Sequence, residues 1–265
     1  MALIFDAVMN TAEHFLHTLY LRSSPLFVFG LLNLLLAVVC LVLARVAPLE
    51  LVGTNAWYKP TKFALSTALL CWSMGWFLGY LPATGGNRVY AWGMVVLLAI
   101  EMVYITWMAA RGQRSHFNTS TPFYSFMYSV MAFAATAITL WTAVVGLQFW
   151  TGRFPDLPEP YLWGIRLGIL LFTVFALEGF VMGGRLSHTI GGPDGGPGLP
   201  FLNWSRQYGD PRVAHFVGMH ALQVLPLLGF YALRSVRAMV VVASLYGLLA
   251  LYVLAQALLG KPLVR

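Results

Sequence analysis

The chain has 265 residues, of which 59% are hydrophobic and only 9% are charged. Because soluble domains carry about a quarter charged residues, this composition excludes a soluble globular protein and indicates an integral membrane protein. The net charge of +7 is spread over loops beside apolar segments, which favours topology signals and anionic lipid headgroups over nucleic acid as its cause. Cys40 and Cys71 both lie inside apolar runs, so no disulfide framework is expected.

The first 24 residues predict an amphipathic helix that lies at the membrane interface. Ile4, Val8, Phe15 and Leu19 recur at helical spacing, with polar residues between them. The segment lacks a basic start, and acidic residues and histidines interrupt its apolar part, which argues against a signal peptide.

Seven apolar runs follow, and each is long enough to cross a bilayer, which takes about 20 mostly apolar residues. We expect spans near residues 25–44, 62–82, 89–110, 122–150, 161–184, 213–233 and 237–260. The sequence therefore predicts an all-α, polytopic membrane bundle of about seven transmembrane helices over residues 25–265, preceded by the interfacial helix of residues 1–24. Tryptophans and tyrosines gather near the run ends, as expected for aromatic belts at headgroup level.

Lysines and arginines are divided unequally between the two sides of this predicted bundle. The side that holds the loops after spans one, three and five carries twice as many of them as the opposite side. By the positive-inside rule, we expect the C-terminus in the cytoplasm and the N-terminus outside, in a membrane such as the bacterial inner membrane.

Two stretches end apolar runs with the same polar signature. "MAARGQRSHFN" (108–118) and "MGGRLSHTIGG" (182–192) each contain arginine followed by Ser-His, on the predicted cytoplasmic side. Each arginine alone fits a topology anchor, and each histidine alone fits a hydrogen-bonded structural residue. Their shared sidedness with "VAHFVGMHALQ" (213–223) suggests convergence on one site. Because histidine is the commonest metal ligand, the candidate metal ligands are His116, His188, His215 and His220.

Two carboxyl groups lie deep in the predicted spans. Glu101 precedes Arg111 by ten residues and Glu178 precedes Arg185 by seven, which corresponds to depths of about 15 Å and about 10 Å at the helical rise. Ionisable residues at such depth are costly and usually face the bundle interior. Glu101 and Glu178 are therefore the candidate catalytic residues.

The connection from Gly191 to Arg212 is long for a compact bundle. It is rich in glycine and proline, yet it also holds Phe201, Trp204 and Tyr208, which a flexible linker would not require. We expect an ordered loop folded back over the cytoplasmic end of the bundle. The candidate cofactor-binding residues on this side are Arg111, Arg114, Arg185, Asn203, Trp204 and Asp210.

Three functional hypotheses follow from this arrangement. The first is a His/Arg/Glu-lined site for haem b or another His-ligated metal ion, serving membrane redox or lipid-directed chemistry on a quinone or lipid substrate. The second is a proton-coupled small-molecule transporter that uses Glu101 and Glu178. The third is a non-catalytic assembly subunit that docks a membrane-protein partner or a second copy of itself. All three stay open at this stage.

Overall fold

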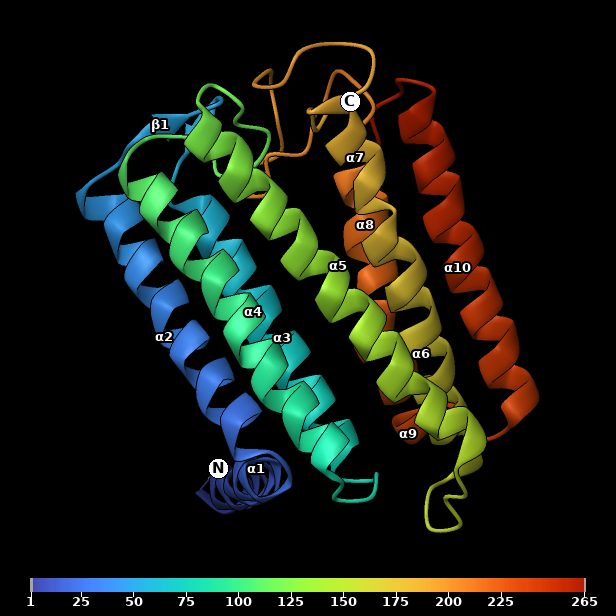
Figure 1. The fold of residues 1–265 in the computed structure, drawn as a ribbon. Helices are drawn as coiled ribbons and strands as arrows, with labels where there is room; N and C mark the ends of the chain where they lie inside the picture. The colour runs from blue at the N-terminus through green and yellow to red at the C-terminus, as the bar shows by residue number, and fades with distance from the viewer. Residues whose placement is uncertain (1, 265) are drawn as a thin grey trace.

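The computed structural model describes residues 2–264, with side chains from residue 11 onward, and is almost entirely helical (Figure 1). The elements are α1 Ala2–Arg22, α2 Ser24–Val46, β1 Glu50–Leu51, β2 Thr54–Asn55, α3 Tyr58–Leu78, α4 Gly85–Ala110, α5 Pro122–Thr151, α6 Glu159–Leu177, α7 Gly179–Arg185, α8 Arg212–Met219, α9 Ala221–Tyr231 and α10 Val236–Leu258.

Six helical segments of the described chain are long and apolar enough to cross a membrane. They are Ser24–Val46, Gly85–Ala110, Pro122–Thr151, Glu159–Arg185, Arg212–Tyr231 and Val236–Leu258. The helix α3 is less apolar but runs the length of the bundle beside α2 and α4, so it completes the expected seven passes. The prediction of an all-α, polytopic membrane bundle is confirmed.

The two ends of the bundle differ in their content (Figure 1). We call the loop-rich end the one that holds β1, β2, residues 111–121, residues 186–211 and the C-terminal residues. At the opposite end, α1 lies across the foot of α2 and α3. The Arg22 guanidinium donates a 2.8 Å hydrogen bond to the Trp76 carbonyl and lies over the Trp76 ring, which fastens α1 to α3. The placement of α1 at a membrane interface stays a prediction.

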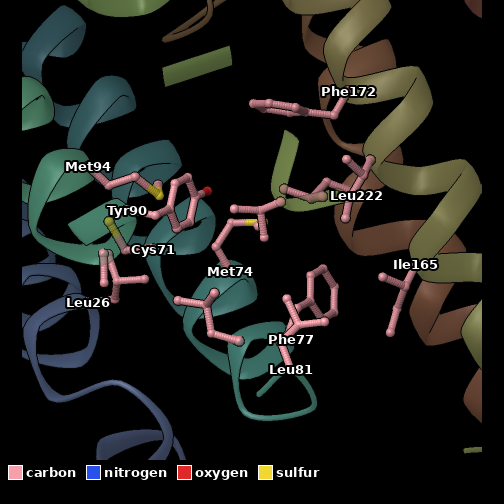
Figure 2. Close-up of a cluster of buried hydrophobic side chains, with 14 of the residues drawn as sticks. Leu26, Cys71, Met74, Phe77, Leu81, Tyr90, Met94, Ile165, Phe172 and Leu222 are labelled. Atoms are coloured by element: carbon pink, nitrogen blue, oxygen red, sulfur yellow. The ribbon is translucent and has the colours of Figure 1, made fainter. Parts of the chain in front are cut away.

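A buried cluster joins the two halves of the bundle (Figure 2). Met74 and Tyr90 come from α3 and α4, whereas Ile165, Phe172 and Leu222 come from α6 and α9. These side chains fill the space between helices, where dispersion contacts rather than water exclusion favour association in lipid. Both cysteines are buried and free, as expected from the sequence.

The helices α6 and α9 approach each other closely. A Cβ atom added at Gly164 would lie 2.7 Å from the Leu225 carbonyl oxygen, and one at Gly168 would lie 2.8 Å from the Ala221 carbonyl oxygen. The two glycines are four residues apart, and this small-xxx-small spacing lets backbones meet inside membranes.

Two spans are broken rather than continuous. The fifth pass breaks at Glu178 between α6 and α7, and the sixth breaks at His220 between α8 and α9. Pro226 lies inside α9, and the interruption of the sixth pass falls at His220. At this interruption the tightly packed Gly218 meets the Phe175 ring, and the His220 ring bonds to Gln223.

The α6–α9 contact predicts opposite effects for two alanine substitutions. Gly168→Ala drives a methyl group into the α9 backbone, and overpacking of this kind costs about 1–3 kcal/mol of unfolding free energy. Gly85→Ala has open space around the added methyl group and improves helix propensity. Melting temperatures in one mild detergent are expected to fall for Gly168→Ala and to hold or rise for Gly85→Ala. Equal melting temperatures for Gly168→Ala and the parent would contradict this packing.

Candidate functional site

Residues 186–211 form an ordered segment over the loop-rich end (Figure 1). Two antiparallel bridges close it into nested turns, Ile190 with Gly209 and Gly198 with Ser205. The expectation of an ordered loop folded back on the bundle is confirmed by the contacts described next.

Asp194 organises the first half of this segment. Its carboxylate accepts backbone hydrogen bonds from His188 (3.0 Å) and Thr189 (2.9 Å), and hydroxyl bonds from Ser187 (2.9 Å) and Thr189 (2.8 Å). Although burial alone would raise it, the His188 side chain, the His188 backbone N–H and the Thr189 hydroxyl hold the pKa of Asp194 far below its usual range. Asp194 is therefore an ionised carboxylate that fixes the backbone on either side of His188.

Asp210 and Arg212 close the second half. The Arg212 guanidinium donates two bonds to the Asp210 carboxylate, from Nε to Oδ1 at 2.8 Å and from an Nη atom to Oδ2 at 2.6 Å. The Ser205 backbone N–H also donates to Asp210 (2.8 Å), and Arg212 donates to the Asn203 carbonyl. Such bidentate pairs are strong and directional, so they fix where the segment re-enters the bundle as α8.

The segment rests on the start of α3 and on the β1–β2 turn. The Lys62 ammonium donates to the Leu202 carbonyl (2.9 Å), and the Asn203 side-chain amide donates to the Val52 carbonyl (3.3 Å). The Phe201 ring meets the Tyr58 ring edge-on at 5.1 Å. Lys59 and Lys62 are thereby partly covered instead of open to solvent.

His116 lies under this cover and is held by a lysine. Its Nδ1 accepts from the Lys59 ammonium at 3.1 Å, with the Ser115 hydroxyl at 3.2 Å. Burial lowers the pKa of His116 well below its usual value, and the charge of Lys59 lowers it further. A neutral ring that accepts at Nδ1 carries its proton on Nε2, so His116 offers an N–H donor.

His188 has the opposite arrangement. Its Nδ1 lies 3.3 Å from an Asp194 carboxylate oxygen. Burial lowers the pKa of His188 to about 4, although the bond to Asp194 opposes that change. The neutral ring therefore donates from Nδ1 to Asp194 and leaves the Nε2 lone pair, which has no partner among the described residues, available to a ligand.

His215 also has a carboxyl group beside its Nδ1, at the break in the fifth pass. Its Nδ1 lies 3.4 Å from Glu178 Oε2, although neither atom makes a well-directed hydrogen bond with a described residue. A Cβ atom added at Gly179 would lie 3.2 Å from His215 Cε1. Glycine at 179 thus leaves room for this ring beside Glu178.

The other two deep candidates lie apart from these three histidines. His220 Nδ1 lies 3.1 Å from the Gln223 side-chain oxygen, and Gln223 donates to the Ser73 hydroxyl at 3.1 Å. Glu101 is buried within α4, and its Oε1 has no hydrogen-bond partner among the described residues. His220 and Glu101 therefore do not join the cluster under the loop.

The predicted cofactor-binding residues divide into two groups. Arg111, Arg114 and Arg185 are exposed at the rim, where Arg111 lies over the Trp107 ring at 5.2 Å. Asn203 and Asp210 hold the loop together through Arg212, and the Trp204 ring packs edge-on against Phe216, 5.6 Å away.

The cations that lie deepest are ones that sequence reasoning did not select as site residues. Lys59 is in electrostatic range of Lys62, Arg114 and Arg212, and neither lysine forms an ion pair within the described residues. The sequence does contain a signal for these two lysines, because Lys59 and Lys62 are three residues apart and therefore share one face at the start of a helix. Their convergence with Arg212 required the folded loop.

Within residues 2–264, no group of three or more histidine, cysteine, aspartate or glutamate side chains is arranged to hold a metal ion. His188 Nε2 and His215 Nδ1 have no hydrogen-bond partner among these residues. No protein-family model, curated protein or solved structure matches this chain.

The lowered pKa of His188 predicts how the stability of the folded protein depends on pH. Because the pKa of His188 is lowered in the folded state, the unfolded chain binds more protons between pH 4 and 6.5. The contribution of His188 to the free energy of unfolding is therefore fully present above about pH 6.5. It is lost as the pH falls towards 4, by on the order of 2 kcal/mol.

His188→Gln should flatten the pH dependence of the melting temperature between pH 4 and 6.5. The exposed His14→Gln is the control, and an identical pH dependence for His188→Gln and the parent would refute the argument.

Proposed function

We propose that this chain is a membrane-embedded enzyme that binds the anionic headgroup of a membrane-dissolved substrate at its loop-rich end and acts on it by proton transfer. One observation carries the proposal. The imidazoles of His188 and His215 each lie beside a carboxyl group. Both lie near the partly covered Lys59 and Lys62, which form no ion pair with an acidic residue among the described residues.

The cations supply the binding half of the proposal. Lys59 and Lys62 lie in the field of Arg212, and Asp210, which would offset them, is already engaged by Arg212. Gathering like charges under a loop destabilises a protein unless an anion is bound there. Phosphate or carboxylate oxygens would accept from these ammonium groups and from His116 Nε2–H, which stands as a fixed donor.

The two histidine–carboxylate pairs supply the chemistry. The Nδ1 atoms of His188 and His215 lie 3.3 Å and 3.4 Å from carboxylate oxygens. A carboxylate at this position stabilises the imidazolium that forms when Nε2 takes up a proton. His215 with Glu178, or His188 with Asp194, would remove a proton from an attacking water or from the substrate. The fitting reaction class is hydrolysis or proton abstraction at the headgroup.

The location of the site supports a substrate that lives in the membrane. The cluster lies at the end of apolar helices, beneath an ordered cover, and the excess of lysine and arginine on this end favours a cytoplasmic position.

A second candidate is a His-ligated cofactor, haem b or a metal ion. Ligating histidines usually donate their other ring N–H to a carboxylate, as the Nδ1 positions of His188 and His215 allow. These two residues would hold the iron or metal, which would supply redox or Lewis-acid chemistry. The unbonded carboxyl oxygen of Glu101 favours the further alternative of proton-coupled transport.

Anion binding is tested with dioleoyl phosphatidic acid and dioleoyl phosphatidylcholine as matched probes in native mass spectrometry. The parent should prefer phosphatidic acid. Lys59→Met with Lys62→Met should weaken that binding at least about tenfold, which corresponds to 1.4 kcal/mol, while raising the melting temperature because buried like charges are removed. Arg153→Met, at the opposite end, is the control and should change neither. Unchanged phosphatidic acid binding in the double variant would disprove the proposed anion site.

The cofactor candidate is tested by visible spectra of the purified protein, oxidised and dithionite-reduced, with metal analysis of the same sample. The proton-transfer proposal predicts a colourless protein without stoichiometric metal. A Soret band that disappears in His188→Gln or His215→Gln would instead establish the haem candidate.

A further inference from the structure

The 186–211 segment, which we call the lid, is built on the half of the bundle that contains α10. A Cβ atom added at Gly209 would overlap the Ala257 carbonyl of α10, and one at Gly191 would lie 3.4 Å from the Gly260 Cα atom. The lid also connects α7 to α8. From this base it reaches across the loop-rich end to the start of α3 and the β1–β2 turn (Figure 1). The lid therefore joins two parts of the bundle that are distant in sequence.

The lid meets the start of α3 and the β1–β2 turn along a contact that we call the seam. Across the seam, the Lys62 ammonium donates to the Leu202 carbonyl at 2.9 Å, and the Asn203 side-chain amide donates to the Val52 carbonyl at 3.3 Å. Both acceptors are neutral carbonyl groups. The seam therefore orders the Lys62 side chain without compensating its charge.

The backbone on both sides of the seam is left-handed, a conformation that L-amino acids rarely adopt. The φ angle is +52° at Val52 on the turn, +61° at Phe201 and +55° at Asn203 on the lid. Such angles are disfavoured, most of all for a β-branched residue such as valine, and they persist only where surrounding contacts hold them. Separation of the seam would let these residues relax, so the closed lid is a strained state.

The seam also gathers positive charge. Lys59 and Lys62 lie on the α3 side, and Arg212, at the end of the lid, lies in electrostatic range of both. Asp210 is engaged by Arg212, and one carboxylate cannot offset three cations. The Arg212 side chain is still 24% exposed. An anion between the two sides would interact with cations on both of them and would reduce the repulsion that opposes closure.

We infer that the 186–211 segment is a lid that opens at the seam to admit the anionic headgroup and closes when the headgroup bridges Arg212 and the lysines of α3. The inference rests on the proposed function for the anion site and adds how access to that site is regulated. His188 belongs to the lid, so closure also brings this base to the headgroup. Because such coupling is reciprocal, an anion that favours closure binds more tightly to the closed form.

Distances across the seam test the lid. One nitroxide label is placed at Glu50→Cys on β1 and another at Pro200→Cys on the lid, both exposed positions. Pulsed electron paramagnetic resonance measures the distance between them in phosphatidylcholine nanodiscs. Cys40 and Cys71 are buried, and the parent without added cysteines measures their background labelling. The anion-free protein should show a short and a long distance. Dioleoyl phosphatidic acid should raise the short-to-long ratio at least about fivefold.

Matched variants separate charge from contact. Lys59 bonds to His116 and makes no hydrogen bond with the lid among the described residues. Lys59→Met should therefore raise the short-to-long ratio without phosphatidic acid and reduce the further change that phosphatidic acid causes. Arg153→Met, at the opposite end, is the control and should change neither. Phe201→Ala removes the ring contact with Tyr58 and no cation, so it should favour the long distance and weaken phosphatidic acid binding.

Three outcomes would overturn the inference. A single distance that phosphatidic acid does not change would show a fixed cover. A longer distance with phosphatidic acid would show that the anion displaces the lid. A Lys59→Met distribution identical to that of the parent would remove the role of charge.

The lid and the proposed function fail separately. If phosphatidic acid binds the parent and not the double lysine variant while the distances stay constant, the lid is wrong and the anion site stands. If phosphatidic acid does not bind the parent, the anion site is wrong. A shift to the short distance in anion-free Lys59→Met would then still support a lid that the seam charges hold open.

Discussion

The bidentate Asp210–Arg212 pair is the interaction on which the loop-rich end depends. It joins the end of the 186–211 segment to the first residue of α8, and through the Asn203 carbonyl it also fixes the segment's inner turn. With that turn in place, the Leu202 carbonyl accepts a hydrogen bond from the Lys62 ammonium, and the Asn203 side chain donates one to the β1–β2 turn. The charges of Asp210 and Arg212 neutralise each other. The neighbouring Lys59 and Lys62 are therefore left without a compensating acidic group among the described residues.

Helix breaks place the titratable groups at this end. The fifth pass breaks after Glu178, and Gly179 lets the His215 ring of α8 lie beside that carboxyl group. Further along the same two passes, Gly164 and Gly168 bring the backbones of α6 and α9 into contact. Close packing at these two glycines thus stabilises the helix pair away from the loop-rich end. Nearer to that end, the break places the polar side chains of Glu178 and His215 between the two passes.

The partner at Nδ1 decides what each histidine can do. His116 faces an ammonium group and can only donate from Nε2, whereas His188 faces Asp194 and keeps a lone pair there. The Nδ1 atom of His215 lies beside the Glu178 carboxyl group. In the proposed function, His116 is the fixed donor and His188 or His215 is the base. That division suits an anionic substrate, since the donor and the cations hold the charge while a base moves the proton.

The sequence alone determined the class of protein and its passes, because hydrophobic length and charge sidedness are local properties that a bilayer imposes on any chain. It also indicated the ordered loop, since Phe201 and Trp204 have no use in a flexible linker.

The sequence did not distinguish His220, which bonds within its own helix turn, from His215, which lies beside Glu178. It also selected Arg111 and Arg185, which lie at the rim, in place of Lys59, Lys62 and Arg212. Only the tertiary structure decided these points, because the partner of a buried charge comes from distant parts of the chain, and the partner determines its chemistry.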